Sequence, residues 1–184
     1  MKKAALFLDR DGVINEDLGY VHKVENFHFI DGIFKLCQYA RKAGMMIFVV
    51  TNQAGIGRGY YTESQFYALT EWMVSRFSEE GVAIDGVYFC PFHPIHGIGE
   101  YKIESLDRKP GAGMILRAAA EHNLDLENSI LIGDREWDIA AAQNAGIGTS
   151  VLLTDQNNPM PPTPDIVVAS LHDAVRLLFP QSVE

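Results

Sequence analysis

Two carboxylates stand two residues apart near the N-terminus, within the run Asp9-Arg10-Asp11-Gly12-Val13. They follow the apolar run Ala4–Leu8, so they are expected at the end of a strand. A helix-capping turn is the ordinary structural explanation of such a pair. The chemical alternative is that one carboxylate attacks phosphorus, with a cation to offset the repulsion between two anions. The other carboxyl group would then protonate the leaving oxygen and later activate water.

Three further polar segments stand at the ends of apolar runs or ahead of helical ones. The segment Thr51-Asn52-Gln53-Ala54-Gly55 offers a hydroxyl, amides and backbone N–H groups that could cradle a phosphate. Lys109 precedes a helical segment, where its charge could hold a phosphate. Asp134 and Asp138 are four residues apart, and a carboxylate at a strand end suits a hard cation. Each has a simpler explanation as a cap or a solvated charge, but together they supply a complete set for phosphoryl transfer.

Short apolar runs alternate with longer segments of helical periodicity. This alternation predicts an α/β fold of three layers, Rossmann-like, with a parallel sheet covered by helices on both faces. Ligands of such sheets bind beyond the carboxyl ends of the strands, where the polar segments would converge. The expected strands are Ala4–Leu8, Met45–Val50, Gly86–Cys90, Ile130–Ile132, Gly148–Leu153 and Ile166–Val168. The expected helices are Gly32–Ala43, Thr62–Glu80, Gly111–His122, Trp137–Ala145 and Leu171–Leu178.

Punctuation residues support these boundaries. Gly44, Gly81 and Gly146 follow three of the expected helices, where a glycine commonly ends a helix. Thr62 with Gln65 has the spacing of a capping box. The boundaries therefore rest on local chemistry as well as on periodicity.

The composition bounds the class of protein. With 184 residues, one domain spanning 1–184 is the default. The formal net charge of −9 argues against a nucleic-acid or anionic-membrane partner. Two cysteines make no disulfide framework, and no run approaches the roughly 20 apolar residues of a membrane span. We expect a cytoplasmic monomer that acts on a small molecule.

In this order, the four polar segments resemble the motifs of the haloacid dehalogenase-like phosphatase superfamily. Within it, the chain is similar over nearly its whole length to the D-glycero-D-manno-heptose 1,7-bisphosphate 7-phosphatases. Histidinol-phosphate phosphatases share the Asp9 and Thr51 motifs but usually differ between Gly19 and Gly32. The runs that carry the resemblance are Phe7 to Asn15, Gly19-Tyr20-Val21-His22, Phe27 to Gly32, Thr51 to Ile56, Thr70-Glu71-Trp72-Met73 and Arg108-Lys109-Pro110.

The resemblance implies a phosphatase that works through an aspartyl-phosphate intermediate. Asp9 would be the nucleophile and Asp11 the general acid and base. Thr51 and Lys109 would hold the transferring phosphoryl group. The fold implied has little cap domain, which leaves specificity to the long insertion loop 91–110.

The resemblance also implies a magnesium site and a set of substrate contacts. Mg²⁺ would be held by the Asp9 carboxylate, the Asp11 backbone carbonyl and the Asp134 carboxylate. Asp138 would support that site without touching the metal. A small phosphorylated sugar is the implied substrate. The implied substrate contacts are Asp17, Leu18, Gly19, Tyr20, Thr51, Asn52, Gln53, Ala54, Arg108, Lys109 and Arg135.

The insertion loop departs from the family's pattern. Relatives usually bind a structural zinc there through a Cys-x-His pair and a Cys-x-Cys pair. Here Cys90 is the only retained ligand, because His93 stands one place late and the second pair reads Ser105-Leu106-Asp107. A closed zinc site needs four ligands, so no structural zinc is expected. An improvised set of Cys90, His93, His96 and Asp107 is the alternative. Without zinc, the loop is expected to be held by packing of Phe92, Ile95, Ile98 and Tyr101.

Arg135 is the second departure, since the heptose enzymes commonly carry lysine there and histidinol phosphatases often carry arginine. Arg108 and Arg135 are expected to recognise a second anionic group of the substrate. Histidinol phosphate, another sugar phosphate or a capsular heptose phosphate is the alternative substrate. A non-catalytic sugar-phosphate-binding relative is a further alternative, although such a protein would be expected to lose Asp9, Asp11 or Lys109 first. The acidic charge argues against a nucleic-acid 3′-phosphatase.

Overall fold

The computed structural model describes residues 2–155 and 162–180. Within them, six parallel strands form one sheet in the order β3-β2-β1-β4-β5-β6. All six apolar runs predicted as strands are confirmed. The strands are β1 (Ala5–Leu8), β2 (Met46–Asn52), β3 (Gly86–Cys90), β4 (Ile130–Gly133), β5 (Thr149–Leu153) and β6 (Ile166–Val168).

The five predicted helices are also present. The sequence did not predict the four-residue helix α2, which comes just after β2, or the two 3-10 turns, η1 and η2. The helices are α1 (Ile33–Lys42), α2 (Ala54–Gly57), α3 (Glu63–Glu79), α4 (Gly113–His122), α5 (Glu136–Ala145) and α6 (Leu171–Leu178). The turns are η1 (Val24–Asn26) and η2 (Gly99–Tyr101).

Local chemistry sets the helix ends as predicted. The Thr62 side chain accepts a hydrogen bond from the Gln65 backbone, and the Gln65 side chain returns one to the Thr62 backbone, which is a full capping box. Gly44, Gly81 and Gly146 all have positive φ angles, of 79°, 74° and 77°. Such angles strain any residue with a Cβ, so glycine ends these helices cheaply.

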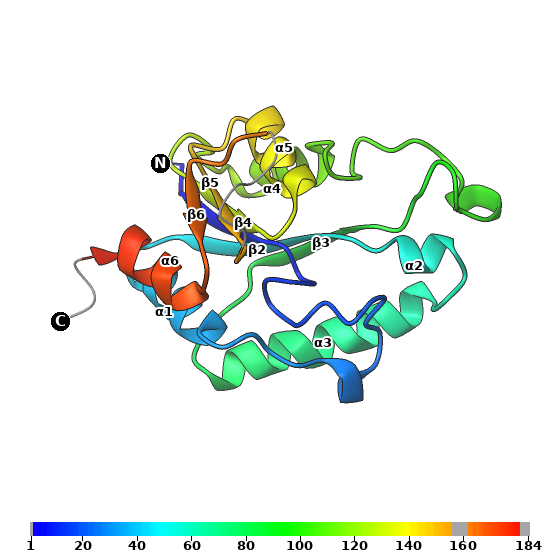
Figure 1. Ribbon diagram of the computed structural model, residues 1–184, viewed down its shortest axis with the longest axis horizontal. Coiled ribbons are helices and arrows are strands. Elements are labelled where there is room, and N and C mark those ends of the chain that lie inside the picture. The colour runs from blue at the N-terminus through cyan, green and yellow to red at the C-terminus, as the bar shows by residue number, and fades with distance from the viewer. Residues whose placement is uncertain (1, 156–161, 181–184) are drawn as a thin grey trace.

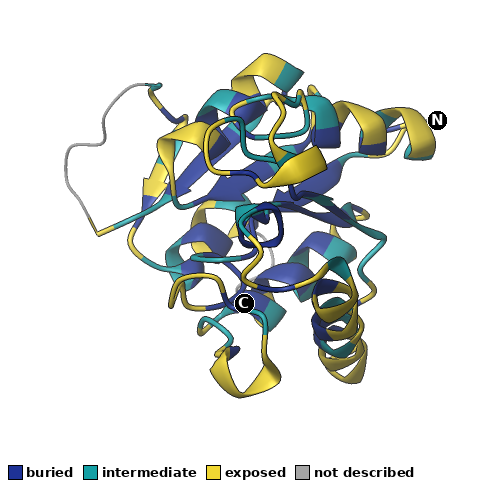
Figure 2. Ribbon diagram, turned by 90° about the vertical axis from the view of Figure 1, so that its right-hand side faces the viewer, coloured by how far each residue is buried: buried dark blue, intermediate teal, exposed yellow. Residues whose placement is uncertain are grey.

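The sheet lies between two layers of helices, with α1, α3 and α6 on one side and α4 and α5 on the other (Figure 1). Successive strand residues point to opposite faces, so each strand serves both layers. Along β1, Leu6 and Leu8 join the core with α1, α3 and α6, whereas Ala5 and Phe7 join the core with α4 and α5. The central strands are buried on both faces (Figure 2). The predicted three-layer Rossmann-like arrangement is confirmed.

The longest helix, α3, is amphipathic rather than uniformly apolar. Phe66, Leu69, Met73 and Phe77 recur at intervals of three or four residues and are buried, while much of the rest of the helix is exposed. None of the helices in the described ranges combines the length and the apolar character that crossing a membrane requires.

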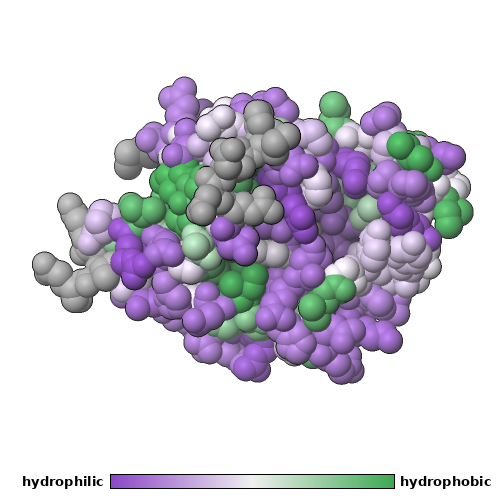
Figure 3. Space-filling view, in the orientation of Figure 1, coloured by the Kyte–Doolittle hydropathy of each residue, from purple (hydrophilic) through white to green (hydrophobic). Residues whose placement is uncertain are grey.

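The prediction that four apolar side chains pack to hold the insertion loop is wrong for two of them. The rings of Phe92 and Tyr101 do lie together, with centroids 6.0 Å apart. Ile95 and Ile98, however, are 68 % and 64 % exposed. Hydrophobic side chains are visible at the end of the molecule where Figure 1 places this loop (Figure 3).

Hydrogen bonds, rather than the side chains of the two isoleucines, hold the insertion loop in place. The Ile98 backbone N–H donates to the Gly57 carbonyl at 2.8 Å, and the His93 backbone N–H donates to the Tyr101 carbonyl at 3.0 Å. The Tyr101 hydroxyl also donates to the Glu63 carboxylate at 2.9 Å. The loop is thereby tied to α2 through its backbone and to the start of α3 through the Tyr101 side chain, while the isoleucine side chains lie in solvent.

Candidate active site

The four polar segments meet at one edge of the sheet. Asp9 directly follows β1, Thr51 lies near the end of β2, and Asp134 directly follows β4. Lys109 comes from the end of the insertion loop, just ahead of α4. Asp9 and Asp134 line a cavity of about 400 Å³, and Lys109 contacts Asp9.

Lys109 stands at the centre of the site and is almost fully buried. Its Nζ lies 2.9 Å from the Val50 carbonyl, 2.9 Å from Asp9 Oδ1 and 2.5 Å from Asp138 Oδ1. The ammonium therefore donates a hydrogen bond to the Val50 carbonyl and forms ion pairs with both carboxylates. Burial alone would lower the pKa of Lys109, but the charges of Asp138 and Asp9 outweigh it and raise the pKa. Lys109 is therefore a fixed cation behind Asp9.

The Asp9 carboxyl group is held on one side only. Its Oδ1 accepts from Lys109 and from the Arg10 backbone N–H at 2.7 Å. Burial raises the pKa of Asp9, and the charge of Asp138 raises it further, against the opposing effect of Lys109. Further positive charge beside Asp9 would favour its ionised form.

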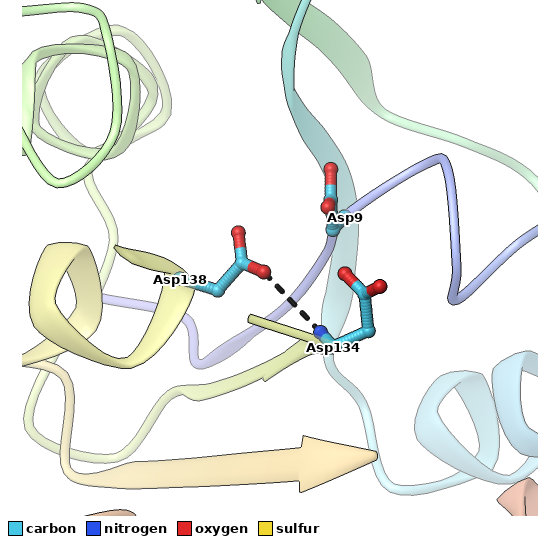
Figure 4. Close-up of side chains that lie close together, drawn as sticks. All are labelled: Asp9, Asp134 and Asp138. Carbon is cyan, nitrogen blue, oxygen red and sulfur yellow. Dashed lines mark hydrogen bonds between the residues drawn. The ribbon is translucent and has the colours of Figure 1, made fainter. Parts of the chain in front are cut away.

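Asp138 fixes the turn between β4 and α5. Its side chain is fully buried, and its Oδ2 accepts from the backbone N–H groups of Asp134 at 3.2 Å and Arg135 at 3.1 Å (Figure 4). Gly133 must be glycine here, since a Cβ on it would lie 2.1 Å from the Asp138 Cβ. The other oxygen of Asp138 pairs with Lys109, so this carboxylate connects the turn to the buried ammonium.

Asp134 faces the cavity and is incompletely partnered. Its Oδ2 lies 3.1 Å from Arg135 Nε, but its Oδ1 is buried without a hydrogen-bond partner. Burial and the charge of Asp138 raise the pKa of Asp134 to about 6, although Arg135 opposes them. The Gly12 backbone comes so close that a Cβ there would lie 2.2 Å from Asp134 Oδ2. Gly12 thus lets the chain pass directly beside this carboxyl group.

These side chains fit a divalent cation. One carboxylate oxygen from each of Asp9, Asp134 and Asp138 lies within 4.8 Å of the others (Figure 4). The ammonium of Lys109 and the guanidinium of Arg135, which also pairs with Asp17, do not fully balance three carboxylates, and the remaining negative charge is unfavourable without a counterion. Carboxylate oxygens are the ligands that Mg²⁺ prefers. We call Asp9, Asp134, Asp138 and Lys109 the acidic cluster.

Asp11 is held by three side-chain donors. Arg10 reaches both of its oxygens, at 2.8 and 3.0 Å, Asn15 Nδ2 donates to Oδ1 at 3.0 Å and Gln53 Nε2 donates to Oδ2 at 3.0 Å. Arg10 is itself buried and also donates to the Val21 carbonyl at 2.6 Å. The Asp11 carboxyl group is therefore oriented at the cavity rather than free to rotate.

The segment after β2 contributes positioning as well as lining. Thr51 is buried, and its Oγ1 accepts from Gln53 Nε2 at 2.8 Å. Asn52 exchanges two hydrogen bonds with the Lys109 backbone, at 3.1 and 3.0 Å, and so fixes the end of the insertion loop. Asn52, Gln53 and Ala54 line the cavity, whereas Thr51 and Lys109 are buried and are not among its lining residues.

The segment before η1 forms another part of the rim. Asp17, Gly19 and Tyr20 line the cavity. Leu18 is 57 % exposed and is not among the lining residues. Arg135 also lines the cavity, and its NH2 lies 3.3 Å from Asp17 Oδ2. Arg135 thus bridges two carboxylates, Asp17 and Asp134, across the rim.

The sequence interpretation missed Arg58 and Tyr61 as cavity residues and gave His93 only as a possible zinc ligand. Trp137, which could either line the site or pack elsewhere, also lines the cavity. A sequence signal for Arg58 was available, because this residue comes one helical turn after the polar segment that follows β2. With His93 and Arg108 it forms what we call the basic cluster, consisting of Arg58, His93 and Arg108.

The basic cluster is poorly neutralised. Burial and the charge of Arg58 lower the pKa of Arg108. Burial and the charges of Arg108, His96 and Arg58 lower the pKa of His93. The Nε of Arg58 is buried without a hydrogen-bond partner. An anionic group bound in this part of the cavity would relieve the repulsion.

The alternative zinc ligands do not gather into a group. Cys90 is buried, which raises the pKa of its thiol. The His93 Nδ1 accepts from the backbone N–H groups of Ile95 and His96, at 3.2 and 3.1 Å, and Asp107 pairs with Arg117 at 2.9 Å. In residues 2–155 and 162–180, the acidic cluster holds the only three His, Cys, Asp or Glu side chains with ligand atoms that close together.

Comparison with known proteins gives consistent relatives. The HAD-hydrolase-like family matches residues 106–174. The chain is 58 % identical over 157 residues, 85 % of its length and 83 % of the relative's, to D-glycero-alpha-D-manno-heptose-1,7-bisphosphate 7-phosphatase of Burkholderia mallei. It is 48 % identical over 153 residues, 83 % of its length and 82 % of the relative's, to the corresponding beta enzyme of Vibrio cholerae. Its fold matches the D,D-heptose 1,7-bisphosphate phosphatase of B. bronchiseptica, solved with magnesium and phosphate, with a TM-score of 0.82, 25 % identity and coverage of 98 % and 99 % of the two chains.

Proposed function

The chain belongs to the D-glycero-D-manno-heptose-1,7-bisphosphate 7-phosphatase family of HAD-like hydrolases, and from this we propose that it removes the 7-phosphate from D-glycero-D-manno-heptose 1,7-bisphosphate. The observation that carries the proposal is the pairing of two opposite clusters in one cavity. The acidic cluster suits a metal ion and the phosphoryl group that it binds, and the basic cluster suits a second phosphate.

We assign the magnesium site to the Asp9 and Asp134 carboxylates and the Asp11 backbone carbonyl. The unpartnered Asp134 Oδ1 and the excess negative charge support this assignment. A magnesium ion bound there supplies positive charge to the phosphoryl oxygens. Asp138 holds the turn that presents Asp134 and binds Lys109.

In the first step, an Asp9 carboxylate oxygen attacks phosphorus while the bond from phosphorus to the sugar oxygen breaks. Asp11, protonated at this stage, donates its proton to the leaving sugar oxygen. Lys109 stabilises the negative charge that develops beside Asp9, and the Thr51 hydroxyl donates to the phosphoryl group. The products of this step are the sugar with a free hydroxyl group at that position and an aspartyl phosphate on Asp9.

In the second step, the Asp11 carboxylate takes a proton from a water molecule whose oxygen attacks the same phosphorus. The bond between phosphorus and the Asp9 oxygen breaks, which releases inorganic phosphate and restores the Asp9 carboxylate. Asp11 is again protonated, so the cycle is closed. Its three donors orient it for both transfers.

We assign the second phosphate of the substrate to the basic cluster. Arg108 can present its planar set of donors, and Arg58 and His93 line the same cavity. Arg135 is less available, because it already pairs with Asp17 and Asp134.

Both cysteines are free and buried, which supports a cytoplasmic location.

The test is phosphate release by the purified protein from heptose 1,7-bisphosphate and from histidinol phosphate, with Mg²⁺ and with a chelator. We expect kcat/KM to favour the heptose bisphosphate by at least about 100-fold, because only this substrate has a second phosphate for the basic cluster to bind. We also expect the chelator to abolish turnover and Mg²⁺ to restore it. Equal or faster turnover of histidinol phosphate would overturn the proposed substrate, and turnover in the chelator would overturn the mechanism.

A further inference from the structure

Gln53 links the two groups that act on phosphate. Its amide nitrogen donates to Asp11 Oδ2 at 3.0 Å and to Thr51 Oγ1 at 2.8 Å. Its amide oxygen accepts from the hydroxyl of Tyr61. The side chain is almost fully buried, so these contacts rather than solvent set its orientation. Both donors and the acceptor of the amide are therefore engaged inside the protein.

The direction of these hydrogen bonds is determined by chemistry. Asp11 accepts from Arg10 and Asn15, and the amide nitrogen of Gln53 faces it as a further donor. The amide oxygen must then face Tyr61, which makes the Tyr61 hydroxyl the donor. Thr51 accepts the second amide hydrogen, which leaves its own hydroxyl hydrogen to be donated elsewhere. That is the polarity a phosphate cradle requires.

Tyr61 is held firmly in this role. Its ring stacks on His22, with centroids 4.9 Å apart and planes 5° from parallel. It packs in a small core with Ile56 and Phe66 and is 5 % exposed. A Cβ on Gly55 would lie 2.2 Å from the ring, so glycine is required there for Tyr61 to fit. Burial raises the pKa of Tyr61, which keeps its hydroxyl protonated as a donor.

We propose that Tyr61 is a positioning residue of the phosphatase, which acts through Gln53 to orient the Thr51 hydroxyl and the Asp11 carboxyl group. The inference rests on the proposed function. Its hydroxyl is engaged by Gln53, so we assign it no contact with the reacting atoms. Without that hydroxyl, the Gln53 oxygen is buried without a donor, and the amide can turn its oxygen toward Asp11.

The first experiment measures kcat and KM of the Tyr61→Phe variant with heptose 1,7-bisphosphate at saturating Mg²⁺. We expect kcat to fall about 5- to 30-fold, as for loss of one buried hydrogen bond that orients reacting groups, with KM within about twofold. Tyr88→Phe is the matched control. Its hydroxyl also bonds a side chain, Glu121 at 2.5 Å, but neither residue lines the cavity, so the kcat of this variant should stay within about twofold of the wild-type value. Unchanged kcat in Tyr61→Phe would overturn the inference.

The second experiment separates positioning from general loosening of the structure. In a Gln53→Met background the connection is absent, so adding Tyr61→Phe should change kcat by less than about twofold. If Tyr61 merely supports the fold, the two losses should multiply, which would overturn the inference. Wild-type protein inactive on the heptose bisphosphate would instead remove the proposed function and the inference with it. Activity in the wild type with multiplied losses leaves the function standing and removes the inference alone.

Discussion

The acidic and basic clusters face the same cavity but are built in different ways. The acidic cluster comes from residues that follow β1 and β4, together with Lys109, which Asn52 of β2 clamps in place. Its ionic groups are almost all tied to one another or to backbone. The basic cluster comes from the end of α2 and from the insertion loop, and its donors remain partly unpartnered. Most of the acidic cluster thus lies at or just beyond the strand ends of the sheet, whereas the basic cluster lies at the end of a short helix and on a loop.

The two clusters carry opposite electrostatic strain. In the acidic cluster, burial and neighbouring carboxylates raise the pKa of Asp9 and Asp134. In the basic cluster, burial and neighbouring cations lower the pKa of His93 and Arg108. Each shift disfavours the charged form, and each is relieved by a ligand of the opposite sign. A metal ion at the acidic cluster and a phosphate at the basic cluster would therefore each stabilise the charged form of the groups that it contacts.

The largest expected effect comes from the acidic cluster. Asp9→Asn removes the attacking oxygen anion while keeping the shape of the side chain, so kcat should fall by at least about 1,000-fold. Phosphate release, measured at saturating substrate and Mg²⁺, checks this. The circular dichroism spectrum should match that of the wild type. Residual turnover above about one per cent in a folded variant would remove Asp9 as the nucleophile.

Lys109→Met should show a smaller kinetic effect and the largest effect on stability. The variant leaves Asp9 and Asp138 buried without their cation, and breaking a buried ion pair typically costs about 3–5 kcal/mol of unfolding free energy. We expect kcat to fall about 100-fold or more, because the variant also lacks the charge beside the nucleophile.

Urea denaturation of Lys109→Met against wild type measures the stability change. The matched control is Lys102→Met, an exposed lysine of the same loop, which should change the unfolding free energy by less than about 0.5 kcal/mol. Equal stability of the two variants would contradict the central place of Lys109 in the acidic cluster.

The contrast between the clusters also explains what the sequence could predict. Six strands, five helices and the three-layer arrangement followed from periodicity. Residues directly after strands could be placed together, because the carboxyl ends of parallel strands meet at one edge. Asp9 and Asp134 are of this kind. The fixed geometry of the sheet made the acidic cluster visible in the sequence.

The basic cluster could not be read in the same way. Arg58 directly follows a helix of only four residues, which is too short to produce a periodic pattern. The orientation of His93 depends on backbone N–H groups of its own turn, and the loop path depends on a bond from Ile98 to Gly57. Ile95 and Ile98 were expected to pack and instead lie in solvent. Where backbone hydrogen bonds determine the path of a loop, the apolar residues in its sequence do not predict which side chains face the cavity.

An intermediate effect is expected from the basic cluster. Arg58→Met should raise KM for heptose 1,7-bisphosphate about 10- to 50-fold, as for loss of a charged hydrogen bond to phosphate, with little change in kcat. For heptose 7-phosphate, which lacks the second phosphate, KM should stay within about twofold of the wild-type value. This difference between the two substrates is the measurement. Equal increases in KM for both would place Arg58 at the transferring phosphate instead.

The smallest expected effect is that of metal removal on the fold. A chelator should abolish turnover, because the acidic cluster needs its cation, yet the basic cluster and its loop are held by hydrogen bonds that need no metal. Loss of Mg²⁺ present at about ten times its dissociation constant lowers stability by about 1.4 kcal/mol, which for a chain of this size is a fall in Tm of roughly 3–6 °C. A structural zinc site contributes about 10–16 kcal/mol, so stripping one would lower Tm far more. Thermal unfolding with and without chelator, with metal analysis of the same preparation, distinguishes the two: a fall of more than about 10 °C that zinc alone restores would show that the loop is held by a metal after all.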